Sequence, residues 1–255
     1  NTSALGNVEF LASRSFSGNA STTDFVITTG TVTASTLLTI SGTFTQGGTF
    51  TSTGNTLYLT GSGKTHTGTM TGASNALNHV FIAGGGTTVL PNASTTNFTI
   101  NSGSALSAPS LLTIAGNYSN SGSYENNSGT LYFSGSGVTL SGEMTTADDD
   151  FNNVEFLGAG TKTFSANAST TALTVSAGTL DVSSRLITIA GAFTQSSTLT
   201  TDTSTTLYFS GSGAITGTLS GFATPPNLTF LASRTLGSNA STTALTVSAG
   251  TLDVS

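Results

Sequence analysis

The sequence predicts an all-β protein: a parallel β-solenoid (β-helix) of about four rungs per ~73-residue repeat, a rung being one full turn of the coil. The motif NASTT recurs at nearly even intervals, beginning at Asn19, Asn92, Asn167 and Asn239. Its last two copies open the longer stretch NASTTALTVSAGTLDVS, which is repeated without a change. Short runs of β-branched and aromatic residues alternate with clusters of Gly, Ser, Thr and Asn, which is the pattern of strands separated by turns.

Each repeat contains four runs with the chemistry of strands. In the first repeat these runs are Val8–Phe10, Phe25–Ile27, Leu37–Ile40 and Leu57–Leu59. Similar runs follow at nearly the same intervals in the next repeat, so we interpret each run as one rung of the coil. The repeats are then residues 1–72, 73–146 and 147–221, followed by a partial repeat at 222–255, all within one continuous solenoid.

The two-residue period of a strand divides each run into inward and outward positions. In the first run Val8 and Phe10 face inward, whereas Glu9 faces outward. Across the repeats the inward positions keep large apolar residues, while the outward position between them varies. The predicted inward residues are Val8, Phe10, Phe25, Ile27, Leu38, Ile40, Phe44, Val80, Ile82, Phe98, Ile100, Leu112, Ile114, Tyr118, Val154, Phe156, Leu173, Val175, Ile187, Ile189, Phe193, Leu228, Phe230, Leu245 and Val247.

Two other β architectures fit this pattern less well. A sandwich or meander needs tight hairpins, and the Asn-Gly and Asp-Gly pairs that favour hairpins are missing from the sequence. A propeller also has four strands in each blade, but its antiparallel blades need the same tight turns. A parallel coil needs none of them, so the solenoid is the preferred interpretation.

The composition bears on the classes of partner. Charged residues make up 6% of the chain, which has five Lys and Arg and a net charge of −6. We therefore expect no nucleic-acid binding, because a cationic patch is needed to displace counterions from phosphates. No apolar run approaches the roughly 18 residues of a membrane-spanning helix, so we expect no membrane insertion within this segment. The chain has no Cys, which excludes disulfides but is compatible with any compartment.

The repeats resemble those of a known class of proteins. Units of the type NxLTI, NAS/T, GTLxV, LTIxGxFT, TLYFSGSG and ISG are similar to repeats of very large bacterial cell-surface proteins. Those proteins are parallel β-helix adhesins and fibres of the filamentous-haemagglutinin-like kind. The resemblance covers the full chain and implies a fold and a surface location. Its motifs are structural, so it implies no ligand.

The NASTT motif supplies the candidate modification sites. Asn19, Asn92, Asn167 and Asn239 each begin an Asn-x-Ser sequon, the acceptor of N-linked sugar. The pattern places them in a recurring exposed loop, so glycosylation at these four residues is an open interpretation.

Three tyrosines form a second recurring feature. Tyr58, Tyr132 and Tyr208 point outward once per repeat and could stack on carbohydrate. Packing beneath a neighbouring loop is the simpler explanation.

The other polar candidates have ordinary interpretations. The acidic run Asp148–Asp150 fits a solvated loop better than a calcium site or the carboxylates of a β-helix enzyme that degrades polysaccharides. The nearest bases, Lys162 and Arg185, fall on later rungs. His66 and His79 lack companions at the spacing of metal ligands. We therefore expect no catalytic residues, no metal and no cofactor.

These observations predict an extracellular or cell-surface structural protein, a rigid solenoid stalk or fibre on a microbial surface, and not an enzyme. The alternative is a glycan-binding adhesin stalk, and a polysaccharide-degrading β-helix enzyme comes third. Neither end of the sequence shows a capping element, which a solenoid needs to cover its last rung. The expected partner is therefore the protein itself, either as the continuation of a longer repeat chain or as copies stacked end to end, with surface glycans as further candidates.

Overall fold

The computed structural model describes residues 4–34, 36–52 and 54–254, and the regular structure in these ranges consists of strands. Residues 1–3 of the first predicted repeat and residue 255 of the last lie outside the described residues. The chain divides into two compact units, Asn1–Gly129 (unit 1) and Thr130–Ser255 (unit 2). Paired strands in both units run parallel, so the predicted all-β parallel solenoid is confirmed.

The strands are short and numerous. Unit 1 contains β1 (Ala4–Leu5), β2 (Val8–Phe10), β3 (Arg14–Phe16), β4 (Ala20–Thr22), β5 (Phe25–Ile27), β6 (Thr31–Ala34), β7 (Leu37–Ile40), β8 (Phe44–Gln46), β9 (Thr49–Ser52), β10 (Thr56–Leu59), β11 (Thr67–Gly68), β12 (Leu77–Ile82), β13 (Gly86–Val89), β14 (Ala93–Ile100), β15 (Ser104–Ser107), β16 (Leu111–Ile114), β17 (Tyr118–Asn120) and β18 (Ser123–Glu125). Unit 2 contains β19 (Thr130–Phe133), β20 (Val138–Gly142), β21 (Phe151–Phe156), β22 (Thr161–Phe164), β23 (Ala168–Val175), β24 (Thr179–Asp181), β25 (Leu186–Ile189), β26 (Phe193–Gln195), β27 (Thr198–Thr200), β28 (Thr206–Phe209), β29 (Ile215–Gly217), β30 (Asn227–Phe230), β31 (Arg234–Leu236), β32 (Ala244–Val247) and β33 (Leu252–Val254).

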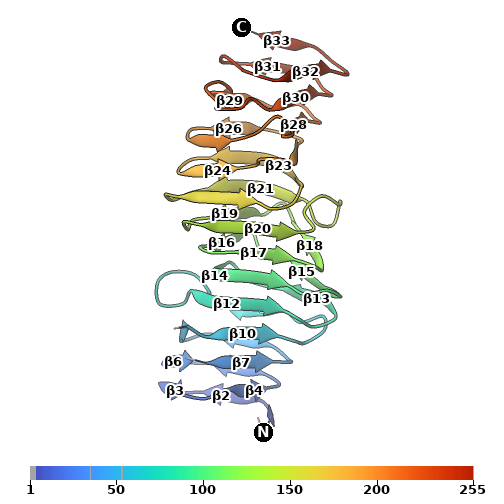
Figure 1. The fold of residues 1–255 in the computed structure, drawn as a ribbon. Coiled ribbons are helices and arrows are strands. Elements are labelled where there is room, and N and C mark those ends of the chain that lie inside the picture. The colour runs from blue at the N-terminus through green and yellow to red at the C-terminus, as the bar shows by residue number, and fades with distance from the viewer. Residues whose placement is uncertain (1–3, 35, 53, 255) are drawn as a thin grey trace. The chain divides into compact units, whose positions relative to one another are not determined.

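A rung has three sides, each formed by a short strand (Figure 1). In unit 1, β2 pairs with β5 and β5 with β8, while β3–β6–β9 and β4–β7–β10 form the other two sides. The predicted count of about four rungs per repeat holds, but the assignment of one run to each rung is wrong. Phe25–Ile27 and Leu37–Ile40 lie on two sides of the same rung. The side between them, Thr31–Ala34, is rich in Thr and short of large apolar residues, so it did not stand out as a strand.

Successive repeats are offset around the coil. One ladder of partner residues begins at Ala20 and passes through Leu38, Leu57 and Val80 to Phe98, which lies four rungs farther along. The alanine of the next NASTT motif is not Phe98 but Ala93, so the motif returns before four rungs are complete.

Unit 2 shows the same offset. Its ladder begins at Ala168 and passes through Ile187, Leu207 and Leu228 to Leu245, whereas the alanine of the next motif is Ala240. The interval between motifs is therefore slightly shorter than four rungs in both units. Within each unit the second copy of the motif therefore lies ahead of the ladder that the first copy begins, at Ala93 instead of Phe98 and at Ala240 instead of Leu245.

The predicted inward residues form the core. In unit 1, Phe25 contacts Phe44 at a ring-centroid distance of 5.5 Å, and Phe44 contacts Phe50 at 5.3 Å, both edge to face. Ile40, Ile82 and the other inward residues of the internal rungs are buried. Burial of these apolar ladders is the main favourable term in the stability of the coil.

The prediction fails for one inward pair. Leu245 and Val247 are 52% and 44% exposed, although Leu173 and Val175, at the same positions of the identical stretch, are 1% and 0% exposed. The register of the two copies is the same. The difference arises because β26 pairs with Leu173 and Val175 on the far side of β23, whereas β32 has no such strand beyond it among the described residues.

Candidate functional site

The asparagine of the NASTT motif joins one rung to the next. Asn19 Oδ1 accepts a hydrogen bond from the Leu37 backbone N–H at 3.3 Å. The bond recurs in the later repeats, where Leu111 N donates to Asn92 Oδ1 at 3.0 Å and Leu186 N donates to Asn167 Oδ1 at 2.9 Å. The asparagine therefore holds the first amide of a strand that lies one rung farther along.

The first threonine of the same motif makes the opposite connection. Its Oγ1 lies close to a carbonyl oxygen of the preceding rung in each repeat. The distances are 2.5 Å from Thr22 to Gly6, 2.8 Å from Thr95 to Asn78, 3.0 Å from Thr170 to Asn152 and 2.8 Å from Thr242 to Pro226. Each Oγ1 also lies within 2.9 Å of the carbonyl two residues ahead, so its single proton can serve either acceptor. We call the Asn and Thr bonds of one motif the NASTT brace.

The expectation that the NASTT motif lies in an exposed loop is wrong. The motif is not a loop: in the first three copies its Ala, Ser and Thr belong to β4, β14 and β23, with the Thr buried. The asparagines themselves are exposed at the start of these strands. The brace uses Oδ1, so it leaves Nδ2, the atom to which N-linked sugar is attached, outside the bond. Glycosylation of Asn19, Asn92, Asn167 and Asn239 stays a prediction.

A cationic side chain points into the coil at one position of the repeat. Lys162 alternates with Phe164 on the inward side of β22 and is 0% exposed. Its Nζ donates to the carbonyl of Gly158 and, at 3.3 and 3.4 Å, to those of Ala159 and Gly160. Burial lowers the pKa of the Lys162 ammonium below its usual value. From the sequence Lys162 was expected only as a base on a later rung. Its inward position went unnoticed, although the alternation Thr161–Lys162–Thr163–Phe164 could have revealed it.

The equivalent residue near the end of unit 2 is Arg234, two residues before Leu236. Its Nη1 donates to the carbonyls of Gly191 at 2.7 Å and Gly213 at 3.1 Å, which belong to two earlier rungs. The guanidinium carbon lies 5.0 Å from the centre of the Phe209 ring. Like Lys162, it donates to backbone carbonyls of the turns between strands.

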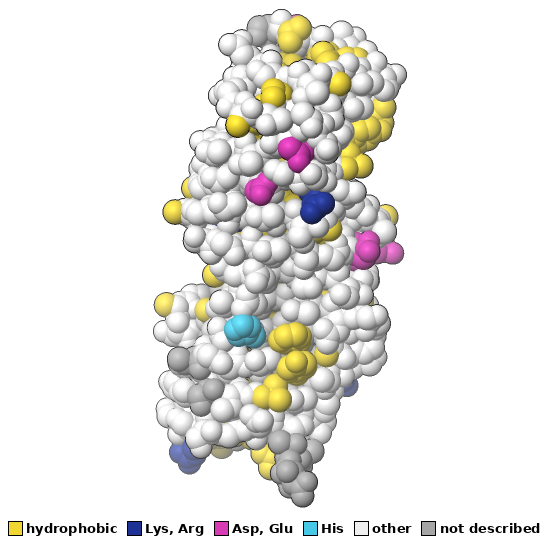
Figure 2. Space-filling model, in the orientation of Figure 1, with side chains coloured by type: hydrophobic (Ala, Val, Ile, Leu, Met, Phe, Trp, Pro, Cys, Tyr) yellow, Lys and Arg dark blue, Asp and Glu magenta, His cyan; other side chains and the backbone are white. Residues whose placement is uncertain are grey.

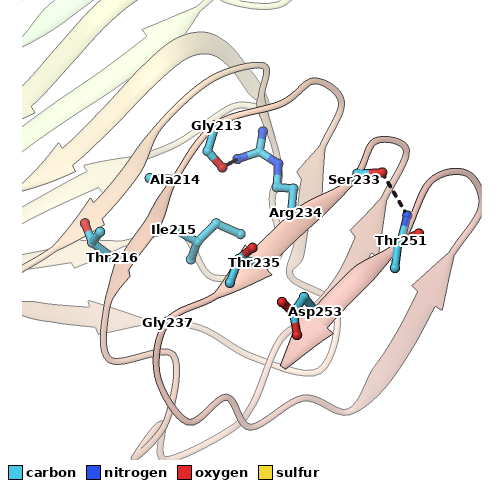
Figure 3. Close-up of a pocket in the computed structure, with 10 residues that line it drawn as sticks. All are labelled: Gly213, Ala214, Ile215, Thr216, Ser233, Arg234, Thr235, Gly237, Thr251 and Asp253. Carbon is cyan, nitrogen blue, oxygen red and sulfur yellow. Dashed lines mark hydrogen bonds between the residues drawn. The ribbon is translucent and has the colours of Figure 1, made fainter. Parts of the chain in front are cut away.

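A pocket of about 570 Å³ lies beside Arg234 (Figure 3). Ile215, Thr216, Thr235 and Asp253 line it together with the arginine. Nη1 and Nη2 of Arg234 already bind carbonyls of earlier rungs, whereas the buried Nε has no hydrogen-bond partner. The other polar side chains that line the pocket are the Asp253 carboxylate and the hydroxyls of Thr216, Ser233, Thr235 and Thr251.

The acidic run Asp148–Asp150 lies in a turn, where Asp148 is exposed and Asp150 is partly buried. Asp149 is buried, and its Oδ2 accepts a hydrogen bond from Thr146 Oγ1 at 2.7 Å. The backbone amides of Asp149 and Asp150 both donate to the Thr146 carbonyl. In the part of the chain that the structure describes, no group of three or more His, Asp or Glu side chains could hold a metal ion.

The two histidines differ in environment. His66 is 3% exposed, and its Nδ1 accepts the Phe44 backbone N–H at 2.9 Å. Burial lowers the pKa of His66 to about 4. His79 lies on the outward side of β12, where its ring nitrogens contact Asn97 Nδ2 at 3.0 and 3.3 Å. Neither histidine has the setting of a metal ligand.

One of the three outward tyrosines stacks on a second ring. Tyr58 in β10 is paired in register with Phe81 in β12, and the two rings are parallel within 4° at 4.6 Å. Tyr132 is instead paired with Glu155, and Tyr208 with Thr229. Packing beneath a loop therefore does not describe Tyr58, which packs on a neighbouring strand. In Figure 2 a hydrophobic patch adjoins the histidine visible on this face.

Comparison with models of known protein families finds no match, and comparisons with curated proteins and with solved structures find none either. The solenoid that the resemblance implied is present, whereas membership of the filamentous-haemagglutinin-like class stays a proposal. No helix in the described ranges has the length and apolar character of a membrane span.

Proposed function

We propose that this chain is a rigid segment of an extracellular structural protein, a solenoid stalk or fibre on a microbial surface, and that it is not an enzyme. The observation that carries the proposal is the NASTT brace. The most strongly repeated motif of the sequence is used to tie one rung of each repeat to its neighbours through Asn and Thr side chains.

The distribution of variation between the repeats supports the same role. Inward positions and brace residues keep their chemistry, whereas the outward position beside Val8 and Phe10 is Glu9, Phe81, Glu155 or Thr229 in the four repeats. Repetition of the parts that hold the coil together is what a mechanical element requires. In a solenoid, stability is the sum of such contacts between neighbouring rungs.

We propose further that the exposed side of β32 and β33 is covered by another rung, from the continuation of a longer repeat chain or from a second copy stacked end to end. Leu245, Val247 and Val254 are exposed there. The support comes from the identical internal copy, in which a further rung covers the same residues.

Two measurements test the structural role. Immunogold labelling of thin sections of the source organism should mark the cell surface, and labelling confined to the cytoplasm would contradict the proposal. Pulling a single chain by its ends should give many similar force peaks. One rung, such as the segment from Leu38 to Leu57, should release about 65 Å of chain at about 3.5 Å per residue. A chain that extends without force peaks would refute a mechanical role, and release of reducing ends from polysaccharides would refute the claim that it is not an enzyme.

A further inference from the structure

The stacked pair Tyr58–Phe81 is a local departure from the repeat. The position of Phe81 is occupied by Glu9, Glu155 and Thr229 in the other repeats, so the second ring belongs to one repeat only. Both side chains are outward and partly exposed. Neither ring is needed to fill the core, because Leu57, Leu59, Val80 and Ile82 on the same two strands already do so.

Each ring has one face that the stack does not cover. On the side of Tyr58 away from Phe81 the partner in the ladder is Thr39, and on the far side of Phe81 it is Thr99. A threonine side chain is shorter than an aromatic side chain, so it leaves the outer face of the neighbouring ring largely uncovered. Neighbouring strands are about 4.8 Å apart. A six-membered ring lying over Thr39 or Thr99 would therefore continue the stack at nearly the spacing the two rings already have.

The two outward ladders around the stack contain no acid, lysine or arginine among the described residues. The outward residues of the ladder that contains the rings are Ser21, Thr39, Tyr58, Phe81, Thr99 and Ser119. The parallel outward ladder two residues away holds Leu37, Thr56, His79 and Asn97. Two residues along a strand are about 7 Å, so the His79–Asn97 pair is within reach of a disaccharide seated on the rings. Hydroxyl, amide and imidazole groups around two apolar ring faces match a ligand that is itself apolar on its faces and hydroxylated at its edges.

We propose that Tyr58 and Phe81 form a binding site for pyranose rings of neutral polysaccharides. Aromatic rings attract such faces, and their rigid side chains lose little freedom on binding. An anionic ligand would find no counter-charge in these ladders. A protein partner would need several hundred Å² on this side alone, far more than two partly exposed rings provide. The site does not depend on the proposed structural role, because the rings contribute to neither the core nor the NASTT brace.

The test uses the whole chain and insoluble cellulose, chitin and β-1,3-glucan as probes, with heparin as the anionic comparator. The chain should bind at least one neutral probe and not heparin. Phe81→Thr, which installs the residue of the fourth repeat, should weaken binding about tenfold or more, the loss of roughly one stacking contact. Tyr208→Ala is the matched control in unit 2 and should bind as the parent chain does.

Two further variants separate a site from a packing feature. Tyr58→Thr combined with Phe81→Thr removes both rings from outward positions that the core does not use, so binding should be lost while the thermal melt is retained. Thr229→Phe should build a second stack with Tyr208 and double the number of sites per chain. Failure to bind any neutral probe, or preference for heparin, would overturn the proposal. So would unchanged binding by Phe81→Thr or by the double variant, an unchanged site number for Thr229→Phe, or loss of binding by Tyr208→Ala.

Discussion

His66 should make unit 1 sensitive to acid. The imidazole is buried beside β8 and accepts the Phe44 N–H through Nδ1. Accepting that bond requires Nδ1 to be unprotonated, so the neutral ring must carry its proton on Nε2. Protonation of Nδ1 would place two N–H groups against each other and bury a charge. The fold therefore selects the neutral ring.

The size of the effect follows from the pKa. Burial lowers the pKa of His66 from 6.5 to about 4, and one pKa unit corresponds to about 1.4 kcal/mol. Since the unfolded chain binds the proton more readily, stability is fully present above pH 6.5 and is lost as the pH falls toward and below 4. The total loss attributable to this histidine is about 3 kcal/mol.

The matched variant is His66→Asn, because asparagine Oδ1 can take the place of Nδ1 as acceptor for Phe44 but does not titrate. Urea unfolding followed by circular dichroism at pH 7.5 and pH 3.5 gives the loss of unfolding free energy for each chain. The parent chain should lose about 3 kcal/mol more than His66→Asn over this range, and His79→Asn, which changes the outward histidine, should behave as the parent. Equal losses in the parent and His66→Asn would refute the reasoning.

Three other predictions concern the way the rungs are held together. Asn167→Ala should lower the free energy of unfolding by about 1 kcal/mol in a urea titration, because it removes the acceptor for the Leu186 N–H. The control is Asn239→Ala, which lies in the identical sequence but has no later strand to brace among the described residues. It should leave the free energy of unfolding unchanged. The lowered pKa of Lys162 means that the parent chain gains stability as the pH is raised toward 10.5, and Lys162→Met should lack this gain when urea midpoints at pH 7 and pH 10 are compared. Ile82→Asp should cost several kcal/mol, and hydrogen exchange should show the damage mainly in the rungs next to β12, since each rung contacts only its neighbours; uniform loss of protection would contradict this one-dimensional behaviour.

The sequence by itself determined the class of fold and the character of the core. The interval between NASTT motifs, the two-residue alternation around Val8 and Phe10 and the missing hairpin pairs are enough for a parallel solenoid. Each of them can be seen in the sequence without knowing which strands pair. The inward side chains were assigned correctly in the internal rungs for the same reason: alternation fixes which side of a strand is apolar, whatever strand lies beside it.

Tertiary structure alone decided how the rungs stack and what the polar residues do. The sequence of a strand does not show whether it forms one side of a rung or a whole rung. Phe25–Ile27 and Leu37–Ile40 therefore could not be placed in one turn of the coil before the pairing of Leu38 with Ala20 was known. The partners of Asn167 and His66 lie far from them along the chain, at Leu186 and Phe44. The residue that meets Tyr58 is set by the length of the intervening loop, which brings Phe81 into register. Contacts between rungs depend on the length of each rung, and within each unit a repeat slightly shorter than four rungs moves the second copy of the motif off the ladder that the first copy begins.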